Sequence, residues 1–142
     1  LCAYREARFA YNQSFSQSGY IAPYWHLKPD GFWFEDRLHT EQHLNSARAV
    51  AEGQADIASL DAVSWRLMER YEPFAVHLRV LDLTEPTPGL PLITAIKNQS
   101  TAIFYAVEQA IAELEEGDKS LLGVKGIERI AKERYLAIPN PT

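Results

Sequence analysis

The sequence contains only one cysteine, Cys2, among 142 residues, so the chain cannot form an internal disulfide bond. We interpret this single thiol as incidental, and it does not indicate the redox compartment of the protein. No apolar run approaches the roughly 18 residues that a membrane-spanning helix requires. Residues 1–20 also lack the basic and then apolar pattern of a secretory signal peptide, so we expect that an exported protein has lost its signal.

Clustered positive charge is also missing from the sequence. The 14 Lys and Arg residues are scattered singly, and the formal net charge is -5. Affinity for nucleic acids depends on basic side chains that pair with phosphates and release counterions. This charge distribution excludes a nucleic-acid partner, whereas a hydrophobic content of 46% is enough for a globular unit with a packed core.

Motifs of catalysis and of nucleotide binding are absent as well. The sequence has neither a G-x-S-x-G nucleophile elbow nor a Walker-type phosphate loop. His39 and His43 are four residues apart, with Glu41 between them, but they do not match H-E-x-x-H, and we expect a helix start to separate their rings. The sequence therefore predicts no enzyme activity, no bound metal and no cofactor.

Strand-like and helical segments alternate along the chain. Short β-branched and aromatic runs predict strands, and apolar residues three and four positions apart predict helices. The predicted strands are residues 8–11, 56–60, 78–83 and 92–95, and a second unit begins at residues 32–34. The first predicted helix can be capped by Ser16 or Ser18 and ends before residues 29–31. The other predicted helices are residues 41–52, 62–71, 100–116 and 127–135, with a weakly apolar helix opening at residue 118. Such alternation requires crossover connections, so the predicted fold class is α/β, with a mostly parallel sheet flanked by helices.

A proline-rich stretch divides the chain. Residues 84–91 hold three of the eight prolines and predict a stiff crossing segment between two parts. The predicted parts are residues 1–83 and residues 92–142. The second part, with one predicted strand, cannot bury a core alone and needs a partner sheet.

Loops at the carboxyl ends of parallel strands form the binding surface of such folds. Here that surface would contain residues 14–19, residues 40–43 and Asp61, which can also cap the third helix. In the first of these loops Ser16 and Ser18 come just before Gly19, at the start of a helix. The first N–H groups of a helix lack internal partners and carry about half a positive charge, and serine hydroxyls donate hydrogen bonds without adding charge. The turn is therefore either an anion site or a capped helix after a polar loop.

Two further residue types fit an anion site at this surface. His43 comes where the second helix starts, so its imidazole could donate to an anion there, although it could equally be a surface histidine. Tyr11 and Tyr20 flank the serine turn and could line a binding site. The aromatic residues as a group, however, mainly have the helical or strand spacing of core residues.

Four segments, taken in order and spacing, resemble the phosphate, phosphite and phosphonate-binding components of ABC transporters. These segments are RFAYN (8–12), SQSGY (16–20), HLNSARAVAEGQADIA (43–58) and DAVSW (61–65). The resemblance covers residues 7–95 and ends in Pro-Gly-Leu-Pro at residues 88–91. It implies a type 2 periplasmic-binding fold, in which two α/β lobes joined by crossing strands close on a ligand.

Within that fold the resemblance implies that residues 1–83 are the second, ligand-binding lobe, residues 84–91 the crossing segment, and residues 92–142 the C-terminal part of the first lobe. The opening segment of the first lobe is then missing, and we expect the chain to be a fragment. In relatives, the serine turn and the histidine of the next helix hold the oxyanion. By this resemblance the binding residues are Ser16, Gln17, Ser18 and His43, with Asp61 near the variable end of the ligand.

The implied function is a noncatalytic solute-binding protein that captures phosphate, phosphite or phosphonate and delivers it to an ABC transporter permease. The implied location is periplasmic or otherwise extracytoplasmic. Two alternatives of the same fold are a ligand-sensing regulatory domain and a small-molecule biosynthetic enzyme. We also expect the chain to form a homodimer or to be marginally stable, because half of a protein exposes the apolar surface that its partner would cover.

Two departures from the family pattern concern the ligand. The usual G-S-H is here Glu41-Gln42-His43, and a carboxylate beside an anion site repels the anion unless it points away. Binders of aminophosphonates can carry an acidic residue in the proline-glycine crossing where this chain has Leu90. A ligand with a free amine is therefore disfavoured.

Overall fold

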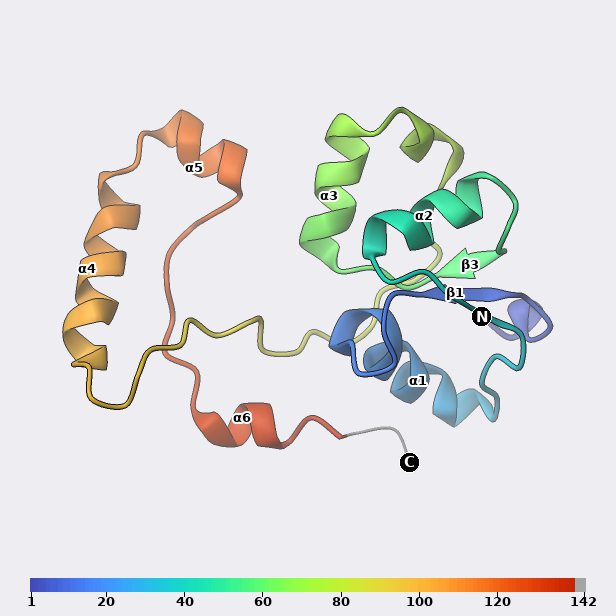
Figure 1. Ribbon diagram of the computed structural model, residues 1–142, viewed down its shortest axis with the longest axis horizontal. Helices are drawn as coiled ribbons and strands as arrows, with labels where there is room; N and C mark the ends of the chain where they lie inside the picture. The colour runs from blue at the N-terminus through green and yellow to red at the C-terminus, as the bar shows by residue number, and fades with distance from the viewer. Residues whose placement is uncertain (140–142) are drawn as a thin grey trace. The chain divides into compact units, whose positions relative to one another are not determined.

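The computed structural model describes residues 1–139 and divides the chain into two compact units (Figure 1). The first unit contains Leu1–Pro86 and the second contains Thr87–Ile138. All buried residues of the described chain lie in the first unit, so its sheet and helices are the place to look for a preformed site.

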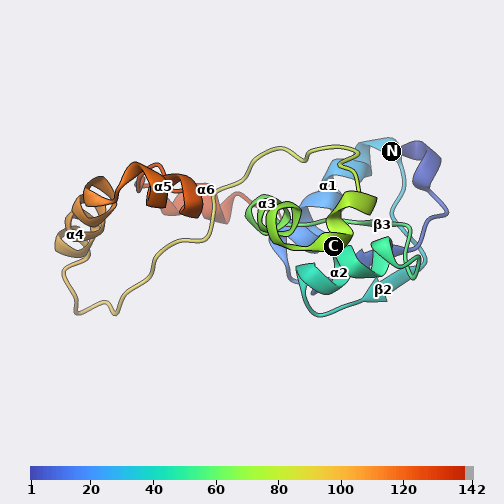
Figure 2. The ribbon, with the colours of Figure 1, turned by 90° about the horizontal axis from the view of Figure 1, so that it is seen from above.

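Three short parallel strands form the sheet of the first unit. They are β1 (Phe9–Tyr11), β2 (Arg37–His39) and β3 (Ile57–Ala58). Their order is β2-β1-β3, so β1 pairs with a neighbour on each side; β2 is labelled in Figure 2. Phe9 is opposite Arg37 in one pair and opposite Ile57 in the other. The predicted α/β class with a parallel sheet flanked by helices is confirmed.

The helices of the first unit follow the predicted segments closely. They are η1 (Cys2–Tyr4), η2 (Gln17–Ile21), α1 (Ala22–Leu27), η3 (Lys28–Asp30), α2 (His43–Ala51), α3 (Ala62–Tyr71) and η4 (Pro73–His77). η2 has π-helical hydrogen bonding and continues directly into α1. α3 ends at Tyr71, because Glu72 precedes Pro73 and the residue before a proline disfavours the helical conformation.

Alternate residues of β1 face opposite sides of the sheet, and each side is covered by a helix. Phe9 packs on the side of α1, in a cluster with Leu27. Ala10 is 0% exposed and packs on the other side, with Ala49 of α2. Figure 1 shows α1 and α2 on opposite sides of β1. The small side chain of Ala10 allows α2 to approach the central strand closely.

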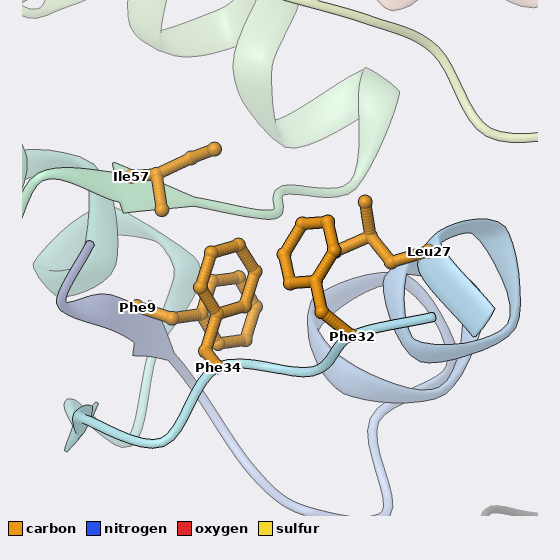
Figure 3. Packing of buried hydrophobic residues seen from close by; sticks show 5 residues of the cluster. All are labelled: Phe9, Leu27, Phe32, Phe34 and Ile57. Carbon is orange, nitrogen blue, oxygen red and sulfur yellow. The ribbon is translucent and has the colours of Figure 1, made fainter. Parts of the chain in front are cut away.

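The larger of the two clusters is aromatic. The rings of Phe9 and Phe34 are stacked at 4.8 Å, and Phe32 meets Phe34 edge to face at 5.6 Å. Figure 3 shows these rings with Leu27 and Ile57 around them. Such pairs contribute about 1 kcal/mol beyond the burial of apolar area. This cluster therefore anchors α1 and the chain before β2 to the sheet.

The strand β2 is the element of the sheet that the sequence does not predict. The apolar signal lies at residues 32–34, which pack in the core without strand pairing. The strand itself comes three residues later, and its two outer residues, Arg37 and His39, are exposed. A strand with this burial pattern lacks the apolar alternation on which prediction depends.

The second unit consists of helices joined by extended chain, as Figure 2 shows. Its helices are α4 (Ser100–Glu113), α5 (Glu116–Leu122) and α6 (Lys132–Leu136). α4 agrees with the prediction. α5 begins two residues before the predicted position, and α6 covers only the end of the predicted helix at 127–135. Residues 87–138 are all described and none of them is buried, in agreement with the expectation that this part cannot form a core alone.

Two of the predicted strands are wrong. Residues 78–83 and 92–95 have alternating or continuous apolar side chains but are irregular in the structure. A strand needs a hydrogen-bonded neighbour, and in the part of the chain that the structure describes no strand pairs with either segment. Their apolar side chains are accordingly exposed, as Leu83 and Ile93 are to 75% and 90%.

Glu41 adopts a left-handed backbone conformation, with φ 69°, immediately before α2. A side chain in this region costs about 1 kcal/mol, a cost that glycine avoids. We predict that Glu41→Gly raises the free energy of unfolding by about 1 kcal/mol in urea denaturation. Glu41→Ala keeps the strained backbone and should give no gain. Gly53 has φ 72° and open space around it, so Gly53→Ala should lower the free energy of unfolding by a similar amount. A higher free energy of unfolding in Glu41→Ala would contradict the backbone explanation.

Candidate functional site

The strand order brings three loops to one edge of the sheet. All three strands are parallel, so the residues after Tyr11, His39 and Ala58 leave the sheet at the same edge. β2, which follows β1 in the sequence, lies on one side of β1. The chain then crosses to the other side of β1, where it forms β3. The crevice at such a reversal of strand order is the usual position of a binding site in open α/β sheets.

The loop after β1 enters η2 through the serine turn. Ser16 is the N-cap of η2, and its Oγ accepts a hydrogen bond from the Gly19 N–H at 3.1 Å. The N–H groups of Tyr20 and Ile21 both donate to the Ser16 carbonyl. π-helical turns of this kind often occur at functional sites. Of the two serines that the sequence offers as caps, the structure uses Ser16, so that Gln17 is the first residue of η2 and Ser18 is the second.

His43 is the first residue of α2 and meets the serine turn. Its Nε2 lies 3.1 Å from the Ser18 Oγ, although 25 residues separate the two in the sequence. The chain before α2 is fixed by Thr40, whose N–H and Oγ1 both donate to the Tyr11 carbonyl, at 2.9 and 3.0 Å. Thr40 Oγ1 also pairs at 2.6 Å with the hydroxyl of the fully buried Ser46. These bonds tie the start of α2 to the end of β1.

Gly19 allows a close approach between the two loops. A Cβ at Gly19 would collide with Asn12, lying 2.9 Å from its Cγ, and would lie 3.2 Å from His43 Cε1. Within residues 1–139, the buried Asn12 Oδ1 and the buried His43 Nδ1 have no hydrogen-bond partner. A glycine is therefore required here by the space that Asn12 and His43 occupy.

Burial controls the protonation of His43. Desolvation lowers the pKa of His43 below its ordinary value of 6.5, whereas the negative charge of Asp61 and the Ser59 backbone act in the opposite direction. The Ser59 backbone thus lies close enough to favour the protonated ring, although Nδ1 makes no hydrogen bond of good geometry. The neutral form of the imidazole consequently predominates at pH 7, and it has one N–H to share between two ring nitrogens.

The loop after β3 completes the arrangement. Ser59 Oγ donates to the Ser18 carbonyl at 2.7 Å, which holds the serine turn against the third loop. Asp61 is the N-cap of α3, and its Oδ1 accepts from the Ser64 N–H at 2.8 Å. The predicted cap at Asp61 is present, and its carboxylate is also the charge that acts on His43.

Tyr11 ends β1, at the edge where the three loops leave. Its ring contacts Tyr20 edge to face at 5.1 Å and stacks on Phe9 at 6.3 Å. The Tyr20 hydroxyl accepts a hydrogen bond from Arg37 at 2.8 Å. Both tyrosines thus have packing roles at the site, in addition to the predicted role of Tyr11 beside a ligand.

The predicted residues therefore come from one edge of the sheet, and Ser18 and His43 are in direct contact. The sequence did not predict two further residues of this edge. Asn12 packs against Gly19, and Ser59 holds Ser18 by a hydrogen bond. Asn12 lies in a segment that carries the family resemblance, and Ser59 follows directly after a strand. Position after a parallel strand was the signal that could have found both.

The geometry differs from that of a serine nucleophile with a histidine base. In a catalytic triad a carboxylate holds the second ring nitrogen of the histidine. Here that nitrogen, His43 Nδ1, has no hydrogen-bond partner in the described chain, and Asp61 Oδ1 accepts from Ser64 instead. Residues 1–139 also contain no group of three His, Cys, Asp or Glu side chains that could hold a metal ion.

A parallel α/β unit whose polar loops and helix N-termini meet at the carboxyl edge has the arrangement in which open α/β sheets bind ligands. Residues 1–135 match the family described as ABC transporter, phosphonate, periplasmic substrate-binding protein. The chain therefore belongs to the family of periplasmic substrate-binding proteins of phosphonate ABC transporters. A comparison with curated proteins gave no match.

Membership of this family confirms the predicted resemblance and fold. It indicates an extracytoplasmic protein with a small-molecule ligand and an ABC transport system. No helix within residues 1–139 has the length and apolar character to cross a membrane.

We predict that Gly19→Ala displaces Asn12 and His43 and lowers the free energy of unfolding by about 1–3 kcal/mol. The change should also shift the His43 Cε1–H signal in NMR spectra, because Cε1 lies beside the new methyl group. Gly126→Ala, which has open space around its Cα, is the control and should do neither. Combining Asn12→Ala with Gly19→Ala should recover part of the loss, and a strictly additive loss would contradict the proposed contact.

Proposed function

We propose that this chain is a noncatalytic binding module that captures phosphate, phosphite or a phosphonate at the edge of the sheet in the first unit. The observation that carries the proposal is the 3.1 Å contact between Ser18 Oγ and His43 Nε2 at the starts of two helical segments. In this proposal the ligand contacts are made by Ser16, Gln17, Ser18 and His43, with Asp61 and Tyr11 at the periphery.

Hydrogen-bond donors and helix dipoles support an anionic ligand. Both η2 and α2 begin at this edge, and a helix N-terminus carries about half a positive charge. The hydroxyl of Ser18 and the ring of His43 are half-buried, so bonds to an anion there are less screened than at the surface. An oxyanion has enough acceptor oxygens to bind several of these donors at once.

The position of Glu41 is compatible with an anion. Its side chain was the departure from the family pattern that raised the question of repulsion, and it is exposed. Glu41 and Gln42 precede α2, whereas His43 faces the serine turn. Asp61 is the nearer negative charge, and we propose that it lies at the end of the site where a substituent of the ligand would be.

We also propose that the first unit is the second lobe of a bilobal protein and that the second unit belongs to its first lobe. The division at residues 86 and 87 lies inside the predicted crossing segment 84–91 and supports this assignment. Closure of two lobes on the bound anion would then deliver it to a permease of the transporter, outside the cytoplasmic membrane.

Exposed apolar side chains support self-association of the isolated chain. In the second unit Leu122 is 56% exposed and Leu136 is 71% exposed. We predict that light scattering on the purified chain gives a mass above 16.1 kDa that increases with concentration, because association covers such side chains. A stable monomer across the same concentrations would contradict this prediction.

The binding proposal is tested by phosphorus NMR titration of the chain with phosphate, phosphite and methylphosphonate. We predict saturable shifts or broadening for at least one anion, and a loss of affinity of about tenfold to a hundredfold in Ser18→Ala and in His43→Ala. Ser14→Ala is the matched control, since Ser14 lies exposed in the same loop. An equal loss of affinity in Ser14→Ala, or no saturable response with any of the three anions, would contradict the proposal.

A further inference from the structure

The contact between Ser18 and His43 limits the hydrogens that the site can offer to an anion. The Ser18 hydroxyl has one hydrogen, and a neutral imidazole has one N–H. One hydrogen lies between Ser18 Oγ and His43 Nε2, which are 3.1 Å apart. What the pair can offer an anion therefore depends on where the remaining hydrogen is.

The environment of His43 Nδ1 decides between the two arrangements. Nδ1 is buried among the residues that the structure describes and makes no hydrogen bond of good geometry, and the nearby Ser59 backbone acts as an acceptor that favours an N–H. A hydrogen on Nδ1 faces that acceptor, whereas a bare Nδ1 would turn its lone pair toward it. The Ser59 backbone thus favours the tautomer with its hydrogen on Nδ1, in which Nε2 accepts from the Ser18 hydroxyl.

In this arrangement neither partner can donate to a ligand. The only hydrogen of the Ser18 hydroxyl points at His43, and Nε2 has none. We propose that capture of an oxyanion breaks this hydrogen bond and takes up one proton on His43, so that the Ser18 hydroxyl and the new Nε2–H both donate to the anion. The proton comes from solvent, and no covalent bond to the ligand forms.

The groups around His43 suit such an uptake. Ser18 faces the ring from η2, Asn12 from the loop after β1, and Ser59 and Asp61 from the loop after β3. Of these four only Asp61 carries a charge, and its negative charge stabilises an imidazolium. The anion adds a second negative charge beside the ring, and it thereby raises the pKa of His43 that burial had lowered.

The proposal has a consequence for affinity that separates it from a site of fixed donors. Above the pKa of the free His43, which lies below 6.5, only a fraction of molecules has the proton that the complex needs. The affinity for an anion of constant charge should then fall about tenfold for each pH unit, up to the pKa of His43 in the complex. A site of fixed donors would show no such dependence.

The inference rests on the proposed function, so the experiment observes the anion and His43 separately. The chain is labelled with ¹⁵N in histidine and titrated with methylphosphonate at pH 7.5, with phosphorus spectra recorded on the same samples. The ring nitrogen shifts distinguish the two neutral tautomers and the imidazolium. We expect a neutral ring with its hydrogen on Nδ1 before the titration and an imidazolium at saturation.

His43→Gln provides a second measurement. Calorimetric titration in two buffers of different ionisation enthalpy counts the protons taken up, and the variant gives the contribution of methylphosphonate itself. We expect the wild-type chain to take up about one more proton per anion than His43→Gln at pH 7.5. If His43→Gln no longer binds, the nitrogen shifts of the wild-type chain still decide.

Three other outcomes are informative. Saturation of the phosphorus signal with a neutral His43 would overturn the inference and leave the proposed function intact. A free protein with its hydrogen on Nε2 would also overturn it, since the Ser18 hydroxyl would already be able to donate. The absence of any phosphorus response would remove the proposed function, and the inference with it.

Discussion

Parallel pairing of β1 with a strand on each side is the constraint on which the rest of the first unit depends. Because all three strands run in the same direction, the loops that follow them leave from one edge. Residues as far apart in the sequence as Asn12 and Asp61 therefore lie at the same edge. Successive side chains of β1 point to opposite faces of the sheet. Phe9 packs in the aromatic cluster on one face, and Ala10 packs against α2 on the other. The same three residues of β1 thus fix both the core and the position of the serine turn.

Close packing at Gly19 links the position of His43 to its chemistry. Asn12 and the imidazole both lie against Gly19, and the partial burial of the ring lowers the pKa of His43. None of the six predicted ligand residues is Lys or Arg, so an anion would be held by hydroxyls, N–H groups and one weak base. A site of this kind gains positive charge only when the ligand itself favours protonation, which is the basis of the inferred proton uptake.

Much of the first unit could be predicted from the sequence, because its signals are local. A cap in the serine turn, the cap at Asp61 and the apolar spacing of α2 are features of consecutive residues, and all are present. The strand β2 and the contact of Asn12 with Gly19 were not predictable in this way, because both depend on residues distant in sequence. The segments 78–83 and 92–95 failed for the opposite reason: their pattern suits a strand, but pairing requires a neighbour that the pattern alone does not provide.

A crystal structure of the chain with methylphosphonate would test the central claim most directly, namely that the edge beside Ser18 and His43 holds an oxyanion. The account predicts an oxygen of the ligand at about 2.6–3.0 Å from Ser18 Oγ, and N–H groups at the start of η2 directed at the ligand. Methylphosphonate bound elsewhere, with the edge empty and the contact between Ser18 and His43 unchanged, would contradict it.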